Sequence, residues 1–378
     1  MEFNEQKLKQ YLENFITYLK YKSVDWDISK GLKSNLFFIS PDQEGYKETV
    51  FLEAQTALDF KNWNNSNFGS GQIIQSAKVA IYKAKNLVFV NQKNHFNNMN
   101  CANIKKSEEI LYSIYCCDDD ATAFEKAINF WGAKYDLIAY LFFIKNKEKY
   151  LPISPKNFDK KFKKLDIKLR MSYKCSFRNY LDFINYINEL RVYMEQYFGF
   201  GVSLLDAHSV IWMMDSVEDF LTNLEETKED KILIDSVNDN FIDSGFTPIK
   251  YGEASTEHSK PKYSNGHKVY TRNPKMSLSA LYYANNSCEY NNNHESFIRK
   301  NSNTKYMEAH HLIPMSQYEN HPNLDIPENI ICLCSNCHNE VHYGKDANAI
   351  IEKLFKKREK HLKARGIIIT LSELKKMY

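Results

Sequence analysis

The sequence lacks an uninterrupted apolar run of about eighteen residues, and no signal-peptide pattern follows Met1. A chain without these features is expected to be soluble and cytoplasmic, with no membrane partner. In that compartment the eight cysteines do not predict a disulfide framework. Internal repeats are also missing. The formal net charge of +3 is too small to indicate a nucleic-acid partner by itself.

The chain nevertheless has ample material for hydrophobic cores. Its 378 residues are 43% hydrophobic and 14% aromatic, which predicts two or three domains. The patterning favours an α+β protein: a mixed α/β domain over 1–224, a polar linker over 225–273 and a smaller domain over 274–378. In the first domain we expect helices around 1–22, 72–85, 105–145 and 179–197, and strands within 34–39, 49–52 and 87–90.

Positive charge is concentrated in one part of the N-terminal region. Between Lys145 and Lys174 there are eleven lysines or arginines and three acidic residues. Such a patch attracts phosphate backbones. The predicted DNA-binding residues are Lys160, Lys161, Lys163, Lys164, Lys168 and Arg170, with aromatic residues between them. The sequence slightly favours the alternative, an ordinary basic helix that covers a core.

Asp206 and His208 are a second candidate pair in this region. They lie in the apolar segment from Leu204 to Trp212. Core residues on both sides favour a buried, hydrogen-bonded pair over a catalytic site.

The cysteines near the C-terminus have the spacing of a zinc site. Cys334 and Cys337 are separated by two residues, which lets two thiolates reach one ion. Upstream, Cys288 supplies a third thiol, whereas Asn291 occupies the position expected for a fourth. His294 is the favoured fourth ligand, and Cys332 or water are the alternatives.

Two pairs of histidines accompany these cysteines. His310 and His311 end a predicted strand, on which neighbouring side chains point to opposite faces, so a bend would be needed for both to serve one site. His338 and His342 are four residues apart at the start of a predicted helix, which puts both imidazoles on one helix face. Asn329, which ends a predicted Pro-Glu-Asn turn, precedes His338 in the sequence.

Together these motifs resemble the zinc-knuckle, McrA-like HNH (ββα-metal) endonucleases. The residues that carry the resemblance are Glu308, His310, His311, Asn329, Cys337, His338 and His342. The resemblance covers about 275–378 and implies a C-terminal ββα-metal nuclease domain with a structural Zn²⁺. The absence of a cysteine at Asn291 departs from the pattern.

The resemblance also implies a role for each residue. His311 would be the general base that activates water against the scissile phosphate. His310 and His338 would hold one divalent cation, Mg²⁺, Mn²⁺ or another metal, with His342 as third ligand or beside the leaving oxygen. Asn329 would hold the loop that orients His311, and Glu308 would bond a ligand imidazole.

The sequence therefore predicts a bacterial restriction-type endonuclease that acts on double-stranded DNA, with an N-terminal domain that recognises sequence or base modification. Duplex cleavage by a single-site module implies a homodimer or two sequential nicks. Two alternatives stay open: an antiphage effector or toxin nuclease controlled by its N-terminal domain, and a zinc-stabilised DNA-binding protein without catalysis.

Overall fold

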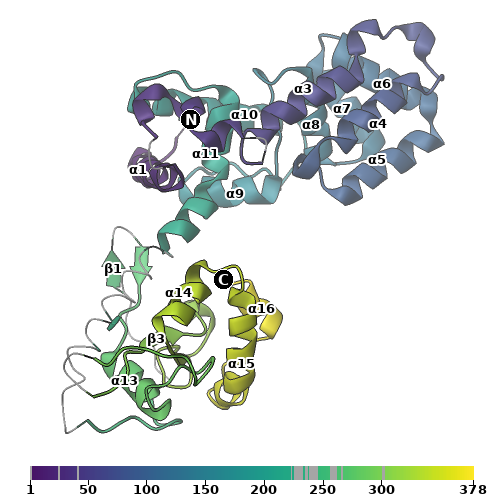
Figure 1. Ribbon diagram of the computed structural model, residues 1–378. Coiled ribbons are helices and arrows are strands. Elements are labelled where there is room, and N and C mark those ends of the chain that lie inside the picture. Colours follow the sequence, from purple (N-terminus) through teal and green to yellow (C-terminus); the bar gives the residue numbers. More distant parts are fainter. Residues whose placement is uncertain are drawn as a thin grey trace. The chain divides into compact units, whose positions relative to one another are not determined.

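A computed structural model describes residues 2–23, 26–40, 42–222, 246–255, 262–264, 267–299 and 303–378, together with residues 224, 233, 234 and 237. The chain forms two compact units, Met1–Glu218 and Asp219–Tyr378 (Figure 1). Much of the predicted linker over 225–273 lies outside the described residues.

The N-terminal unit is helical throughout its described residues. Its helices are, in chain order, α1 (Glu5–Lys22), α2 (Leu36–Ile39), α3 (Tyr46–Leu58), α4 (Gln72–Tyr82), α5 (Val90–Ala102), α6 (Ile104–Cys116), α7 (Asp120–Trp131), α8 (Tyr135–Lys145), α9 (Pro155–Lys164), α10 (Phe177–Phe198) and α11 (Leu204–Trp212). Short 3-10 turns connect several of them. The helices expected near 1–22, 72–85, 105–145 and 179–197 are therefore confirmed, with 105–145 divided into α6, α7 and α8.

Helix α8 is the centre of this unit. Every residue from Tyr135 to Ile144 is buried, and α8 packs against α3, α6 and α7. A helix that is apolar on all sides is a core helix. Among the described residues, however, no helix combines the length and the hydrophobicity needed to cross a membrane.

The three strands predicted in this unit are wrong, so the mixed α/β assignment is corrected to a helical one for the described residues. Residues 49–52 lie inside α3, where Val50, Phe51, Ala54 and Leu58 are buried at helical spacing. Leu87 ends a 3-10 turn, and the exposed Val90 begins α5. Short apolar runs do not distinguish a strand from a helix, which explains the error.

The C-terminal unit combines short strands with helices. Its elements are β1 (Lys262–Ser264), β2 (His267–Val269), α13 (Pro274–Tyr283), β3 (Glu308–His311), a 3-10 helix over Met315–Asn320, β4 (Ile330–Leu333), α14 (Ser335–Tyr343), α15 (Ala347–Ala364) and α16 (Leu371–Lys375). β1 pairs with β2, and β3 pairs with β4, both antiparallel.

The β3–β4 hairpin and α14 form a ββα arrangement. Glu308 pairs with Leu333 and His311 with Ile330, so the hairpin brings the loop over 312–329 back to the histidine pair. Helix α14 follows β4 after a single residue and packs on both strands, while α13 covers them as well. Figure 1 shows α15 beside α14. The strand ending in the histidine pair and the helix carrying His338 and His342 are thus confirmed.

Part of the predicted linker packs on the C-terminal unit. Residues 246–255 are described, and Phe246 and Ile249 pack against its core. Arg365 on the α15 side donates to the carbonyl oxygens of Gly252 and Ala254, and the Gly252 N–H donates to Glu328 Oε1 at 2.6 Å. This stretch therefore belongs structurally with the ββα unit.

Candidate functional site

The structure gathers four predicted zinc ligands. Cys334 and Cys337 lie at the start of α14, Cys288 follows α13, and His294 lies in the next loop. One side-chain ligand atom from each lies within 4.8 Å of all the others. His294 Nδ1 is 3.2 Å from Cys337 Sγ and 3.5 Å from Cys334 Sγ. Zinc–ligand distances of about 2.0–2.3 Å place tetrahedral ligand atoms at such separations.

The chemistry of the thiols also fits a cation. Burial raises the pKa of the Cys337 thiol, and the nearby sulfurs of Cys288 and Cys334 raise it further. Thiolates this close repel one another unless a positive ion offsets their charge. Cys332 is outside this group: its thiol is buried and its backbone N–H bonds Glu289. The residues therefore suit a Cys3His zinc site.

A second group contains three histidines. His310 from β3 and His338 and His342 from α14 place one ring nitrogen each within 4.8 Å of the others. Burial lowers the pKa of His310, and the neighbouring histidines lower it further, so its imidazole is neutral, the form that binds metals. His310 Nδ1 and His338 Nε2 are buried and accept no hydrogen bond from the described residues. These atoms are suited to hold one divalent cation.

Glu308 orients His338. The His338 Nδ1–H donates to Glu308 Oε2 at 2.7 Å, and the Ser335 hydroxyl donates to Glu308 Oε1 at 2.7 Å. Although burial opposes ionisation, these hydrogen bonds lower the pKa of Glu308. A ligand imidazole bonded in this way has a fixed tautomer, with Nε2 left for a metal.

Tyr378 has the corresponding position beside His310. Its hydroxyl oxygen is 2.9 Å from His310 Nε2, and the hydroxyl lies 2.7 Å from the Leu312 carbonyl oxygen, to which it donates. The hydroxyl oxygen can accept from His310 Nε2–H, and His310 Nδ1 then keeps the lone pair that a metal ion would need. No sequence signal indicated this contact, because Tyr378 is distant from every motif.

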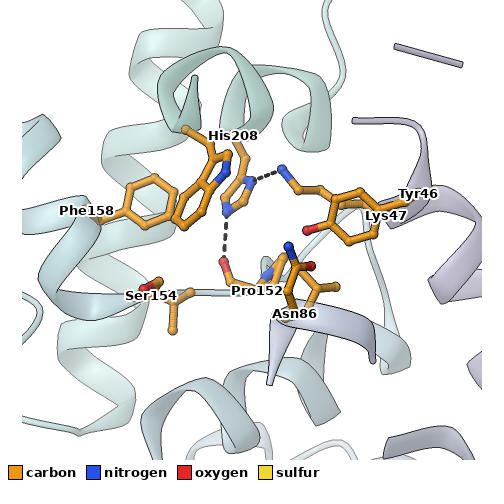
Figure 2. Close-up of a pocket in the computed structure, with 10 residues that line it drawn as sticks. Tyr46, Lys47, Asn86, Pro152, Ser154, Phe158 and His208 are labelled. Carbon is orange, nitrogen blue, oxygen red and sulfur yellow. Dashed lines mark hydrogen bonds between the residues drawn. The ribbon is translucent and has the colours of Figure 1, made fainter. Parts of the chain in front are cut away.

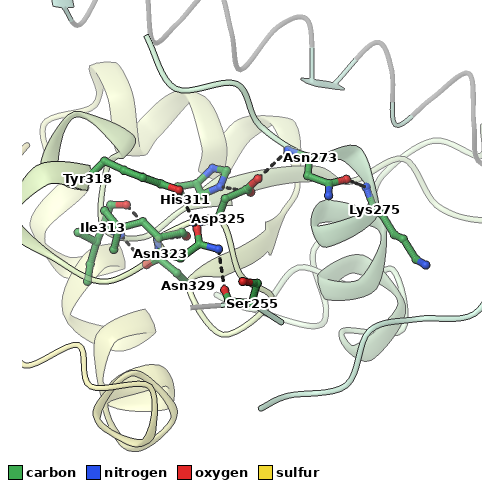
Figure 3. A network of polar contacts seen from close by, with 10 residues as sticks. Ser255, Asn273, Lys275, His311, Ile313, Tyr318, Asn323, Asp325 and Asn329 are labelled. Atoms are coloured by element: carbon green, nitrogen blue, oxygen red, sulfur yellow. Dashed lines mark hydrogen bonds and ion pairs between the residues drawn. The ribbon is translucent and has the colours of Figure 1, made fainter. Parts of the chain in front are cut away.

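His311 is not a member of the three-histidine group, and its ring instead meets Asp325. His311 Nε2 is 3.0 Å from Asp325 Oδ1, and both side chains are buried (Figure 3). His310 and His311 bond different groups, Tyr378 and Asp325, as expected for adjacent residues on a strand. Asp325 was missed by sequence reasoning; the only available signal was an acidic residue in the loop between the two metal-binding segments.

Asn329 closes the loop that carries Asp325. Its fully buried amide donates to the carbonyl oxygens of Ile313 and Leu324 at 3.0 and 2.9 Å, and its Oδ1 accepts from Ile313 N–H at 2.9 Å (Figure 3). Asn329 thus has no direct bond to His311 among these contacts. It fixes both ends of the loop, whereas Asp325 contacts the imidazole.

His208 is one of the residues that line a small cavity in the N-terminal unit (Figure 2). His208 Nε2 is 2.9 Å from the Pro152 carbonyl oxygen, and Nδ1 is 3.4 Å from Lys47 Nζ. Lys47 also donates to Glu44 and Ser209, so its three N–H groups are used within the protein. The cavity volume of about 30 Å³ admits only water.

These contacts correct the expected pairing of Asp206 with His208. Asp206 accepts instead from the hydroxyl of Ser203, the residue that caps α11, at 2.6 Å. Burial, and then the positive charge of Lys47, lower the pKa of His208, so the imidazole is neutral. The cluster ties α3 to α11 and is structural.

Part of the predicted DNA face is also corrected. Lys161 is only 2% exposed, because it shares a face of α9 with the buried Phe158 and Phe162. Its ammonium group donates to Asp215 Oδ2 at 2.6 Å. Lys164 bonds both Asp215 and Glu218. Four members of the predicted face are exposed and form no ion pair with a described residue: Lys160, Lys163, Lys168 and Arg170.

Comparison with known proteins agrees with this geometry. Residues 292–341 match the HNH endonuclease family, a segment that contains β3, β4 and most of α14. Over 88 residues the chain is 36% identical to the type IV methyl-directed restriction enzyme EcoKMcrA of Escherichia coli strain K12. That similarity covers 23% of this chain and 30% of the relative, so the chain spans less than a third of that protein's length. No solved structure matches the chain.

We predict that Cys334→Ser releases zinc and destabilises the C-terminal unit, because a structural zinc site contributes directly to the free energy of folding. Zinc content per chain and the thermal unfolding curve measure both effects. Cys117→Ser, at an exposed free cysteine of the N-terminal unit, is the matched control and should keep the metal. Unchanged zinc content and melting in Cys334→Ser would contradict the assignment.

We predict that Tyr378→Phe weakens divalent-cation binding at the three-histidine group by about 10- to 100-fold, the usual effect of losing an outer hydrogen bond to a metal ligand. Titration calorimetry with Mn²⁺ measures the affinity. Tyr343→Phe is the control, since that ring is 71% exposed on α14. Equal affinities in the two variants would show that Tyr378 does not support His310.

Proposed function

We propose that the chain is a restriction-type endonuclease acting on double-stranded DNA, because residues 292–341 are an HNH endonuclease domain. The supporting observation is the convergence of His310, His338 and His342 in a ββα unit, with His311 adjacent on the same strand. The N-terminal unit would supply the recognition of DNA sequence or modification.

In this proposal His310, His338 and His342 hold a single divalent cation such as Mg²⁺ or Mn²⁺. When bound, the cation would stabilise negative charge on the non-bridging and leaving oxygens of the scissile phosphate. Glu308 keeps His338 in the ligand tautomer through the 2.7 Å bond to Nδ1.

His311 would act as the general base. Its imidazole takes a proton from water while the water oxygen forms a bond to phosphorus and the bond from phosphorus to the leaving oxygen breaks. His311 Nδ1 supports this role because it is buried and without a hydrogen bond to the described residues. A neutral imidazole with its proton on Nε2 has its available lone pair on Nδ1.

The four-residue zinc cluster would have a structural role. Cys288 and His294 belong to the segment after α13, whereas Cys334 and Cys337 belong to the start of α14. An ion held by all four residues would fix the start of α14 and so the position of His338 and His342.

For recognition, we propose that the exposed Lys160, Lys163, Lys168 and Arg170 contact the DNA backbone. A bare phosphate-contacting module has little sequence preference, so a separate recognition element is needed. The E. coli relative is named as a methyl-directed enzyme. We therefore propose that base modification affects cleavage. Cutting of both strands would proceed through a homodimer or two sequential nicks.

We predict that His311→Ala lowers the rate of plasmid cleavage by about 10²-fold or more, because a positioned general base contributes about that factor. DNA affinity and zinc content should stay unchanged. His321→Ala removes a histidine outside the site and serves as control. Cleavage by His311→Ala at the wild-type rate would exclude His311 as the base.

We predict clustered fragment ends when modified and unmodified phage genomes are digested with Mg²⁺ or Mn²⁺ and the ends are sequenced. A recognition domain restricts cleavage to defined sites, whereas an effector nuclease gives random ends and a non-catalytic binding protein gives none. The comparison between genomes shows whether modification directs the cut.

The predicted DNA face is tested by replacing Lys160, Lys163 and Lys168 together with glutamate and measuring DNA binding. DNA affinity should fall, and the salt dependence of binding should decrease by about one counterion for each phosphate that the lysines no longer neutralise. Lys61→Glu, at an exposed lysine of the 3-10 turn Phe60–Asn62 that packs on α6, is the charge-reversal control. Equal affinity of the triple variant and wild type would remove this face from the proposal.

A further inference from the structure

We propose that Asp325 is the positioning residue of the nuclease site: it holds the His311 Nε2–H so that Nδ1 is the nitrogen that takes the proton from water. This inference rests on the proposed role of His311 as general base, and it adds a residue that the motif does not contain.

The Asp325 carboxylate is bonded on both oxygens. Oδ1 lies 3.0 Å from His311 Nε2, and Oδ2 accepts from the Asn273 backbone N–H at 2.6 Å (Figure 3). Both side chains of the pair are buried, with Asp325 6% and His311 4% exposed. Water does not compete for such a pair, so the carboxylate determines which imidazole nitrogen carries the proton.

The surrounding loop fixes the carboxylate in turn. The Asp325 N–H donates to Asn323 Oδ1 at 3.0 Å, and the Asn323 amide donates to the Ser255 carbonyl oxygen at 2.8 Å. Tyr318 also bonds Asn323 Oδ1, at 3.2 Å. Asn329 holds the neighbouring Leu324 carbonyl. Asp325 is thus held through its backbone, through its side chain and through the preceding residue of the chain.

This arrangement defines the tautomer of His311. With Nε2–H donated to Asp325, the lone pair is on Nδ1, which is buried and forms no hydrogen bond with the described residues. A buried nitrogen without a partner costs free energy unless a ligand satisfies it. When Nδ1 takes the proton from the attacking water, the resulting imidazolium lies beside a carboxylate that stabilises it, and it later releases the proton to solvent.

An amide cannot replace this carboxylate. Asp325 receives two donors, from His311 and from Asn273, and asparagine offers a single acceptor oxygen. The Asn273 backbone N–H cannot become an acceptor, whereas an imidazole can exchange its tautomer. In Asp325→Asn the amide oxygen therefore stays with Asn273, and its NH₂ donates to His311 Nε2. The proton of His311 then moves to Nδ1, the atom needed as base.

The test is the histidine tautomer in the full chain. Selective ¹⁵N-histidine labelling and long-range ¹H–¹⁵N NMR distinguish Nε2–H from Nδ1–H, and His311→Ala identifies the signal. We expect Nε2–H in the wild type and Nδ1–H in Asp325→Asn. Plasmid cleavage by Asp325→Asn should fall by about 10²- to 10⁴-fold, as for a base held in the wrong tautomer, with DNA affinity unchanged.

Glu328→Gln is the matched control. Glu328 is a buried carboxylate of the same loop that bonds Gly252 and Arg365 and does not contact His311. Its amide variant should lose stability but keep the Nε2–H signal and the cleavage rate per folded molecule. If Asp325→Asn lowers cleavage together with the melting temperature while the tautomer stays Nε2–H, Asp325 is a structural residue and the proposal is overturned.

The wild-type spectrum is itself decisive, because it requires neither a folded Asp325 variant nor an active nuclease. An Nδ1–H signal for His311 in the wild type would overturn the proposal. Failure of the proposed function looks different: wild-type protein that cleaves no DNA, or His311→Ala that cleaves normally, leaves the tautomer assignment readable.

Discussion

The side-chain amide of Asn329 makes the hydrogen bonds on which the position of the His311–Asp325 pair depends. Its three hydrogen bonds join the residues just after β3 to those just before β4, so the long loop between the strands is closed at its base. A closed loop returns Asp325 to the end of β3, where His311 lies. Replacement of the amide by an apolar side chain would leave buried backbone groups without partners and free the loop.

The parts of this site that depend on local spacing could be predicted from the sequence. Two residues between Cys334 and Cys337, and three between His338 and His342, fix their relative directions once a knuckle and a helix form. The same holds for the histidine pair on β3. His294 required only the observation that Asn291 is a poor ligand, and the structure places it beside the thiols.

The remaining parts depend on contacts between distant segments, for which spacing carries no information. Asp325 meets His311 only because the loop closes, and Tyr378 meets His310 through a contact across 68 positions in sequence. In the N-terminal unit, short apolar runs were assigned to strands although their neighbours complete helical faces. Lys161 shows the same limit. It belongs to a basic stretch in sequence, but the helical spacing of α9 places it on the buried face with Phe158 and Phe162.

Helix α14 and its N-cap carry members of both clusters: two thiols at the opening turn and two imidazoles on the face beyond. The proposed zinc site and the proposed catalytic cation site therefore depend on the same helix. In the proposed zinc site, oxidation of Cys334 and Cys337 to a disulfide would remove two ligands, so that Cys288 and His294 would no longer be held at the start of α14. A nuclease with this arrangement would lose its activity under oxidative stress or zinc starvation without a separate inhibitor.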